Sequence, residues 1–161
     1  MPIRAARPGI PQADALELRT AAAGDMELLF GLLRAALGPW VERTYGAWNE
    51  EEQREIFFAR TDPATHQVVE LRGRPIGCLA VRRSPEEIRL LRVFLFPDLQ
   101  NRGFGSQLVR SVLAEGEAAR LPVRLRVFTV NPARHLYERL GFHVVGETET
   151  HTLMEWKPGA D

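Results

Sequence analysis

The most specific segment of the sequence is Leu95-Phe96-Pro97-Asp98-Leu99-Gln100-Asn101-Arg102-Gly103-Phe104-Gly105-Ser106. An apolar run ends at its start, two glycines follow within a short turn, and a helical pattern of apolar residues begins after them. Glycine lets the backbone approach a ligand closely, and the first amides of a helix have no partner inside the helix. Those amides and the helix dipole favour a bound anion, so the segment predicts a phosphate-binding turn.

Two other glycine-rich phosphate-binding motifs do not fit this segment. A dinucleotide-binding fingerprint needs a third small residue where Leu108 stands, and an acidic residue about 20 positions further on, where Arg124 and Arg126 stand instead. A Walker loop needs Gly-Lys followed by Ser or Thr, which the sequence does not contain. The rest of the chain must therefore indicate which ligand the turn takes.

Hydrophobic patterns on either side of the turn predict alternating strands and helices. Helices are expected from the cap at Gly24-Asp25 to Gly38-Pro39, and at about 50–60, 106–119 and 132–140. Strands are expected at about 15–19, 67–71, 76–81, 88–96, 123–130, 142–146 and 151–156. The order strand-helix-strand over 88–130 implies a parallel pair, and the hairpins imply antiparallel neighbours. The expected fold class is α/β (α+β mixed), a mixed sheet with helices on both faces.

Composition and charge are those of one ordinary globular domain. The chain has 161 residues, of which 45% are hydrophobic. Lys+Arg and Asp+Glu both number 21, which gives no indication of a nucleic-acid or membrane partner. Residues 1–12 are interpreted as a flexible arm and 13–161 as the single domain. No apolar run approaches the roughly 18 residues of a membrane span, and the arm lacks the apolar core of a signal peptide, so the expected compartment is cytoplasmic.

Few side chains suggest a metal site or a disulfide. Cys78 is the only cysteine, and its apolar neighbours indicate a small buried hydrophobe. The histidines at positions 66, 135, 143 and 151 show no metal-ligand spacing. The sequence therefore predicts no metal.

Two motifs resemble the signatures of the GNAT acetyltransferase family. Gln100-x-x-Gly103-x-Gly105 resembles its Gln/Arg-x-x-Gly-x-Gly/Ala signature. The segment Asn131-Pro132-Ala133-Arg134-His135-Leu136-Tyr137-Glu138-Arg139-Leu140-Gly141-Phe142 resembles its second signature, in which an asparagine, an alanine, a tyrosine and Gly-Phe follow one another. The resemblance covers about residues 15–157. It implies the GNAT fold, a central, mostly antiparallel sheet that splays between two parallel strands, here 88–96 and 123–130, with a bulge in the first.

The resemblance also implies acetyl-CoA as cosubstrate and transfer of its acetyl group to a primary amine of a small molecule or peptide, by direct attack in a ternary complex. Tyr137 matches the tyrosine thought to protonate the leaving thiolate. Because tyrosine has a pKa of about 10 and a thiol of about 8.5, its expected role is a hydrogen bond that strengthens as charge grows on sulfur. The implied cofactor-binding residues are Leu95, Gln100, Asn101, Arg102, Gly103, Phe104, Gly105, Ser106, Asn131 and Arg134. For Arg134, a solvated helix position is an equal alternative.

The sequence does not identify a general base. Some GNAT members carry a glutamate on the strand before the bulge, where residues 89–91 of this chain include no carboxylate. Glu42, Glu87 and His151 are candidates, as are Asp62 and an ordered water. Because the strand carboxylate is missing, a catalytically idle acyl-CoA-binding sensor or interaction module on the same fold is the second hypothesis.

Three further expectations concern the surroundings of the site. Trp40, Tyr45 and Trp48 follow the first helix, and either a wall of the acceptor pocket or ordinary core packing would account for them. His135 stands two residues before Tyr137 on a helix, so it is expected to point elsewhere. The oligomeric state and the length of the acyl chain are not determined by the sequence, and a homodimer is one option.

Overall fold

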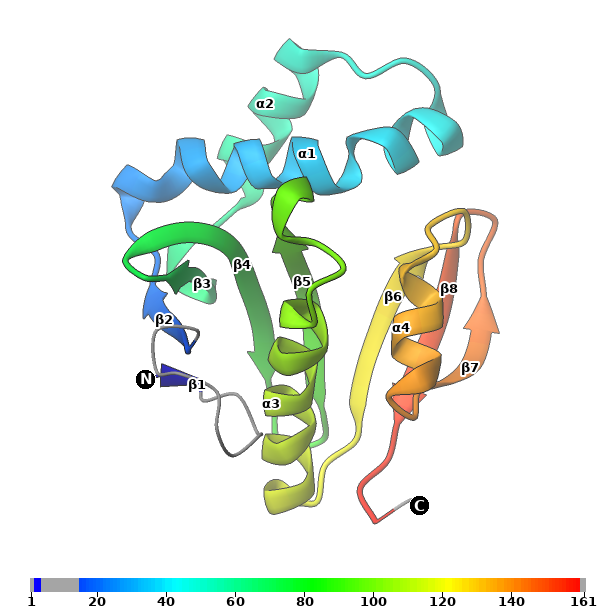
Figure 1. Ribbon diagram of the computed structural model, residues 1–161. Helices are drawn as coiled ribbons and strands as arrows, with labels where there is room; N and C mark the ends of the chain where they lie inside the picture. Colours follow the sequence, from blue (N-terminus) through cyan, green and yellow to red (C-terminus); the bar gives the residue numbers. More distant parts are fainter. Residues whose placement is uncertain (1, 4–14, 160–161) are drawn as a thin grey trace.

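The computed structural model describes residues 2–3 and 15–159, which form one eight-stranded sheet in the order β1-β2-β3-β4-β5-β6-β8-β7 (Figure 1). The strands are β1 (Pro2–Ile3), β2 (Leu16–Thr20), β3 (His66–Leu71), β4 (Arg74–Arg83), β5 (Ile88–Leu95), β6 (Val123–Phe128), β7 (His143–Glu147) and β8 (His151–Trp156). The helices of more than one turn are α1 (Met26–Tyr45), α2 (Glu50–Arg60), α3 (Phe104–Ala119) and α4 (Ala133–Arg139). All neighbouring strands are antiparallel except β5 and β6, which confirms the expected fold class.

Within the segment expected to be an N-terminal arm, Pro2–Ile3 form β1 and pair with β2. Residue 1 and residues 4–12 of that segment lie outside the described residues.

The sheet separates two hydrophobic clusters, because successive side chains of a strand point to opposite faces. Val69 and Leu79 pack in the cluster that contains the apolar side of α3, whereas Val68 and Cys78 pack in the cluster that contains α1 and α2. Cys78 is fully buried there, as predicted, and burial raises the pKa of its thiol to about 12. The helices therefore cover both faces of the sheet.

A β-bulge interrupts β5 at Leu91. Ala80 of β4 pairs with Arg92, but the next residue, Val81, pairs with Leu90, so Leu91 has no partner on β4. An extra residue reverses the alternation of side chains beyond it. Arg92 therefore shares the α1 side of the sheet with Phe94, where its guanidinium lies over the Phe94 ring.

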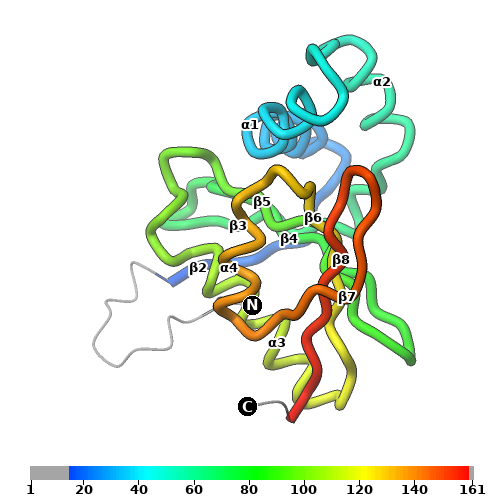
Figure 2. Tube along the Cα trace, turned by 90° about the vertical axis from the view of Figure 1, so that its right-hand side faces the viewer, coloured from blue at the N-terminus to red at the C-terminus, as the bar shows by residue number. Residues whose placement is uncertain are grey.

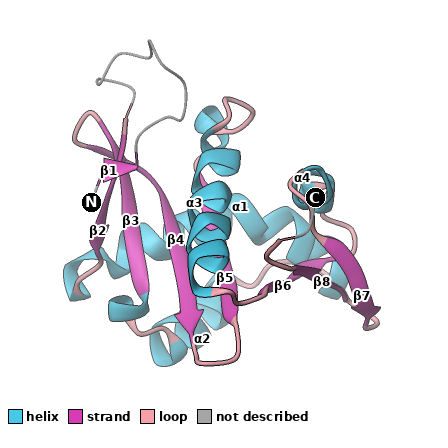
Figure 3. Cartoon of the chain, turned by 90° about the horizontal axis from the view of Figure 1, so that it is seen from below, coloured by secondary structure: helices cyan, strands magenta, loops and turns pink. Residues whose placement is uncertain are grey.

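The parallel pair β5–β6 exists only at one end of the two strands. Ile88 pairs with Val123 and Arg89 with Arg124, and beyond these residues the strands separate (Figure 3). At the paired end Arg124 donates hydrogen bonds to Glu87 (3.2 Å) and to Glu155 on β8 (2.7 Å). The expected bulge and the expected splay are both confirmed.

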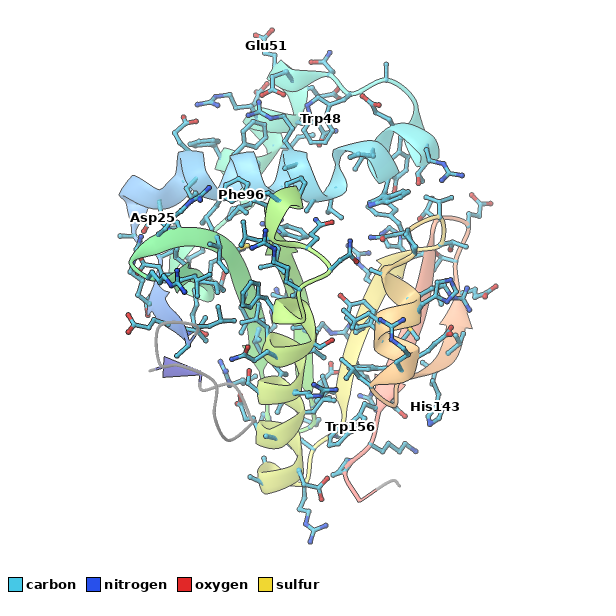
Figure 4. The ribbon with its side chains drawn as sticks, viewed as in Figure 1. Asp25, Trp48, Glu51, Phe96, His143 and Trp156 are labelled. Atoms are coloured by element: carbon cyan, nitrogen blue, oxygen red, sulfur yellow. The ribbon has the colours of Figure 1, made fainter. Side chains whose placement is uncertain are left out.

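The prediction that Gly38-Pro39 ends the first helix was wrong, because α1 continues to Tyr45 with Pro39 in its interior. A proline inside a helix removes one hydrogen bond and costs about 3 kcal/mol. Two contacts accompany the longer helix: Tyr45 packs edge-to-face on Phe128 at 6.0 Å, and a ring atom of Trp48, which Figure 4 labels, lies 4.0 Å from where a Cβ on Gly38 would be. The longer α1 crosses the open end of the splay (Figures 1 and 2).

Candidate active site

A cavity of about 760 Å³ lies where β5 and β6 have separated. Four segments line it: the middle of α1, the end of β5, the glycine turn with the start of α3, and α4 with the residues before it. Its lining residues are Ala36, Leu37, Trp40, Val93, Phe94, Leu95, Gln100, Asn101, Gly103, Gly105, Ser106, Asn131, Pro132, Ala133, His135, Leu136, Tyr137 and Arg139. Phe94 belongs to the cluster on the α1 side and Leu95 to the cluster on the α3 side. The cavity therefore reaches both faces of the sheet.

The glycine turn presents free backbone amides to this cavity. Asn101 and Gly103 have φ angles of 62° and 86°, in the left-handed region, and α3 begins directly after Gly103. The amide of Gln107 is the first to bond inside the helix, to the Gly103 carbonyl at 3.0 Å. The amides of residues 104–106 consequently have no helical partner, and Gly103 caps the helix without a side chain. Such a helix start is a site for an anion such as phosphate.

The end of β5 offers main-chain groups to an extended ligand. The Phe96 amide donates to Ile76 of β4 at 3.0 Å, so the main chains of Val93 and Leu95, at alternate positions, face away from β4. On that side β6 has already diverged. The Leu95 carbonyl accepts a hydrogen bond from Gln100 Nε2 at 3.1 Å, which ties the glycine turn to the strand. The Leu95 amide and the Val93 main chain face the cavity side.

Tyr137 lines the cavity from α4. Its ring packs edge-to-face on Phe142 at 5.7 Å, and burial raises the pKa of its hydroxyl to about 12. Within residues 2–3 and 15–159, nothing hydrogen-bonds to this hydroxyl. At neutral pH Tyr137 is therefore a protonated donor available to a group bound in the cavity.

The predicted cofactor-binding residues divide into two groups. The residues that line the cavity are Leu95, Gln100, Asn101, Gly103, Gly105, Ser106 and Asn131. Asn131 also accepts a hydrogen bond from the Ala133 amide at 2.9 Å, which fixes the start of α4. Arg102 is exposed, Phe104 packs against the α3 cluster, and Arg134 pairs with Glu138 at 3.1 Å, so these three lie outside the lining.

Sequence reasoning missed several lining residues. Ala36 and Leu37 show only the helical periodicity of their segment. Arg139 lies within the second motif, at a position that the motif does not specify. Of the three aromatic residues on or after α1, Trp40 lines the cavity, whereas Tyr45 contacts Phe128 and Trp48 packs near Phe30.

The expectation that the His135 side chain points away from Tyr137 stays a prediction. His135 is among the residues that line the cavity, although its side chain is 67% exposed and lies 3.7 Å from Glu138. The segment from Asn131 to Tyr137 borders the cavity almost without interruption, since α4 is short and begins at the cavity edge. Angular separation on the helix therefore does not remove His135 from the site.

The candidate carboxylate bases lie outside the cavity lining. Glu42 is an exposed residue of α1. Glu87 accepts hydrogen bonds from Arg89 (3.1 Å) and Arg124 (3.2 Å) at the closed end of the splay. Burial alone would raise the pKa of Glu87, but these hydrogen bonds and charges lower it below its usual value. Asp62 caps the turn before β3 through the Ala64 amide.

His151 is also outside the lining. It stacks on Phe128 at 4.3 Å, and its Nδ1 lies 2.7 Å from the Thr150 hydroxyl. Burial and the charge of Arg126 lower the pKa of His151. As none of the eighteen lining residues is an aspartate or glutamate, the described part of the chain brings no carboxylate into the cavity wall.

The described residues contain no group of three His, Cys, Asp or Glu side chains suited to a metal ion. Among these residues, too, every helix is too short or too polar to cross a membrane.

The sequence was compared with a family model and with curated proteins. Residues 34–142 match the model of the acetyltransferase (GNAT) family. No curated protein matches the sequence significantly.

Several solved structures share the fold. The PaiA N-acetyltransferase of Thermoplasma acidophilum, in complex with coenzyme A, superposes with a TM-score of 0.68 at 20% identity, covering 88% of this chain and 98% of that one. The ribosomal-protein-S18-alanine N-acetyltransferase of Escherichia coli superposes with a TM-score of 0.65 at 17% identity, covering 91% of this chain and 96% of that one. The N-acetylglutamate synthase of Neisseria gonorrhoeae, complexed with coenzyme A and N-acetyl-glutamate, superposes with a TM-score of 0.64 at 14% identity. This superposition covers 90% of this chain and 35% of that one. These similarities show the GNAT fold. Because the family model also covers more than half of the sequence, the chain belongs to the GNAT acetyltransferase family.

Proposed function

We propose that the protein is an acetyl-CoA-dependent N-acetyltransferase that moves the acetyl group to a primary amine while both substrates are bound. Family membership supports acetyl-CoA-dependent acetyl transfer in general, and the proposal adds the amine acceptor and direct attack. The observation that carries it is the cavity at the splay, which one glycine turn, the free edge of β5 and Tyr137 all line.

The chain's own groups fit acetyl-CoA. The amides of residues 104–106 suit the diphosphate, because several donors act with the helix dipole there. Gly105 lines the cavity, so the absence of a side chain at this position leaves room for a close approach. The main chains of Val93 and Leu95 suit the amide groups of the pantetheine arm, as an added strand would. Acetyl-CoA brings the activated thioester to the site.

In the proposed reaction the amine nitrogen forms a bond to the thioester carbonyl carbon, and the bond from that carbon to sulfur breaks. The amine loses one proton, and the departing thiolate gains one, so the reaction is balanced. Tyr137 donates a hydrogen bond to the sulfur as negative charge develops on it. With a pKa of about 12, the tyrosine holds its proton rather than giving it up fully to a thiol of pKa about 8.5.

The absence of a carboxylate from the lining favours acceptors that arrive neutral. A lysine-like amine with a pKa near 10.4 is neutral in less than about one molecule per thousand at pH 7, whereas an α-amino group of pKa about 7.7–8 is neutral in roughly a tenth. α-Amino groups and other amines of low pKa are therefore the preferred acceptors in this proposal.

The decisive experiment measures free thiol released from acetyl-CoA in the presence of a panel of amines, with acetylated product identified by mass spectrometry. Acceptor-dependent thiol release supports the proposal. Stabilisation by acetyl-CoA in a thermal shift, without thiol release by any amine, would instead support an acyl-CoA-binding module.

A further inference from the structure

The end of the cavity on the α1 side is apolar and aromatic. It is lined by Ala36, Leu37 and Trp40 of α1 and by Phe94 of β5. Ala36 and Leu37 pack against the same cluster as Phe94, so they form one continuous surface. The free amides of the glycine turn lie with α3, on the other side of the sheet. If the phosphates of acetyl-CoA occupy those amides, as in the proposed function, the α1 end is the part of the cavity left for the acceptor.

Two arginines lie against rings of this apolar wall, although neither is a lining residue. The Arg92 guanidinium lies over the Phe94 ring at 6.0 Å, and that of Arg43 lies 5.9 Å from the centre of the Trp40 ring. Arg92 is half-buried, and its polar partner is His66 Nε2 at 3.1 Å. In the described part of the chain, neither Arg92 nor Arg43 forms an ion pair with a carboxylate.

Arg139 adds a further positive charge to the lining, and no aspartate or glutamate balances it there. A positive charge near a bound amine disfavours its ammonium form, and desolvation acts in the same direction. A second ammonium on the acceptor would be buried or repelled without a partner, which costs far more than burying an alkyl group.

We infer that the acceptor is a monoamine carried on an alkyl or aromatic group, and that the wall formed by Leu37, Trp40 and Phe94 rejects polyamines. This inference rests on the proposed N-acetyltransferase function. The wall selects the apolar carrier, and the surrounding arginines select against a second positive charge.

Pentylamine and cadaverine test the inference directly at about pH 9, where a usable fraction of each alkylamine is neutral, because they share one carbon chain and differ in a second amine. We expect kcat/KM for pentylamine to exceed that for cadaverine by about tenfold or more, and phenethylamine to be used at least as well as pentylamine. Cadaverine used as well as pentylamine, or better, would overturn the inference.

Two variants of α1 sharpen the comparison. Leu37→Glu places a carboxylate in the wall and should lower the pentylamine-to-cadaverine ratio about tenfold. Leu37→Gln, of equal size but uncharged, should leave the ratio near that of the parent protein. Ala47→Glu adds the same charge just after the same helix, at an exposed position outside the cavity lining, and serves as the second control. If all three variants lower the pentylamine-to-cadaverine ratio equally, the wall does not determine this selectivity.

Trp40→Ala should lower kcat/KM for phenethylamine about tenfold and for methylamine much less, with unchanged affinity for acetyl-CoA. Equal losses for both amines would contradict a specificity role for Trp40. Melting curves check each variant, and the comparison of probes on the parent protein decides the matter if a variant does not fold.

Failure of the proposed function gives a different pattern. If no amine releases thiol, calorimetric titration of the CoA complex with pentylamine and cadaverine still measures selection by the wall. Tighter binding of pentylamine then supports the inference although the enzyme proposal fails, and equal or absent binding overturns both.

Discussion

At the scale of single residues, Tyr137 is half-buried and lines the cavity, and burial raises the pKa of its hydroxyl to about 12. Tyr137→Phe keeps the edge-to-face contact with Phe142 and removes only the hydroxyl. We expect kcat to fall by about 10²–10³-fold, with affinity for acetyl-CoA and melting temperature nearly unchanged, because the hydroxyl donates a hydrogen bond to charge that develops in the transition state. Steady-state thiol release, with isothermal titration for affinity, measures both.

Tyr45 is the only other tyrosine and provides the matched control. Tyr45→Phe removes a hydroxyl outside the cavity, so it should leave kcat unchanged. A Tyr137→Phe variant with full turnover, where chemistry limits the rate, would leave Tyr137 with a packing role alone.

A side chain placed on Gly105 tests whether the glycine turn binds the phosphates. A Cβ on Gly105 would lie 3.7 Å from Leu136 and 3.9 Å from Leu95, ordinary contact distances, so the fold should tolerate a side chain. Gly105→Val should nevertheless weaken acetyl-CoA binding at least about tenfold, because the branched side chain blocks approach to the amides of residues 104–106.

Gly31 in α1 has open space around its Cβ position, so Gly31→Val controls for placing valine in a helix. Isothermal titration and melting curves compare the two variants. If Gly105→Val binds acetyl-CoA as tightly as Gly31→Val does, the diphosphate lies elsewhere.

At the scale of elements, Gly77 sets how closely β4 approaches β5. A Cβ at Gly77 would lie 2.2 Å from the Phe94 carbonyl oxygen and 3.3 Å from the Leu95 Cα, both backbone atoms that cannot move aside freely. Gly77→Ala should therefore lower the free energy of unfolding by about 1–3 kcal/mol, seen as a lower midpoint of chemical denaturation.

Gly31→Ala is the matched substitution, and we expect it to change the free energy of unfolding in the opposite direction. It fills open space in the middle of α1 and should raise the free energy of unfolding by up to about 1 kcal/mol, because alanine favours the helix. Two substitutions with the same effect on stability would show that β4 and β5 adapt to a side chain at Gly77.

At the scale of the whole molecule, the contact of buried His66 with half-buried Arg92 links stability to pH. Burial, and then the charge of Arg92, lower the pKa of His66 below its usual 6.5, although a hydrogen bond to the Asp62 carbonyl opposes them. The unfolded chain therefore takes up a proton that the folded chain refuses, and stability is lost as pH falls below about 6.5 towards the folded pKa.

His66→Gln should flatten this loss by up to about 1.4 kcal/mol per pH unit in that window, measured by urea denaturation from about pH 7 to 5. The similarly lowered pKa of His151 acts in both proteins and cancels in the comparison. His143→Gln, at an exposed position, is the matched control. An unchanged slope in His66→Gln would show that His66 is protonated in the fold.

The set of residues that line the cavity predicts how kcat/KM depends on pH. With no carboxylate in the lining, kcat/KM should climb from about pH 6 to 9 as the amine itself loses its proton, without a plateau near neutrality. A profile that levels off near pH 7 with an ε-amino acceptor would reveal a base, and variants of Glu42, Glu87 and His151 would then locate it.

Features that depend on neighbouring residues could be predicted from the sequence alone. The glycine turn at 100–106, the short helix between Asn131 and Gly141 and the position of Tyr137 could be predicted because turns, caps and helix starts are set within a few residues. The order of elements was likewise sufficient for the parallel pair and the mixed sheet.

Which side chains meet in the cavity depends on contacts between distant parts of the chain. Pro39 reads as a helix stop in the sequence, but the contacts of Tyr45 with Phe128 and of Trp48 at Gly38 stabilise a longer α1, and this places Trp40 at the site. Glu42 and Glu87 are likewise absent from the lining because of where the fold places them. Glu42 is exposed on α1, and Glu87 lies at the paired end of β5 and β6. Such contacts join residues far apart in the chain, so their free energy cannot be read from local sequence, although it is large enough to override a local preference.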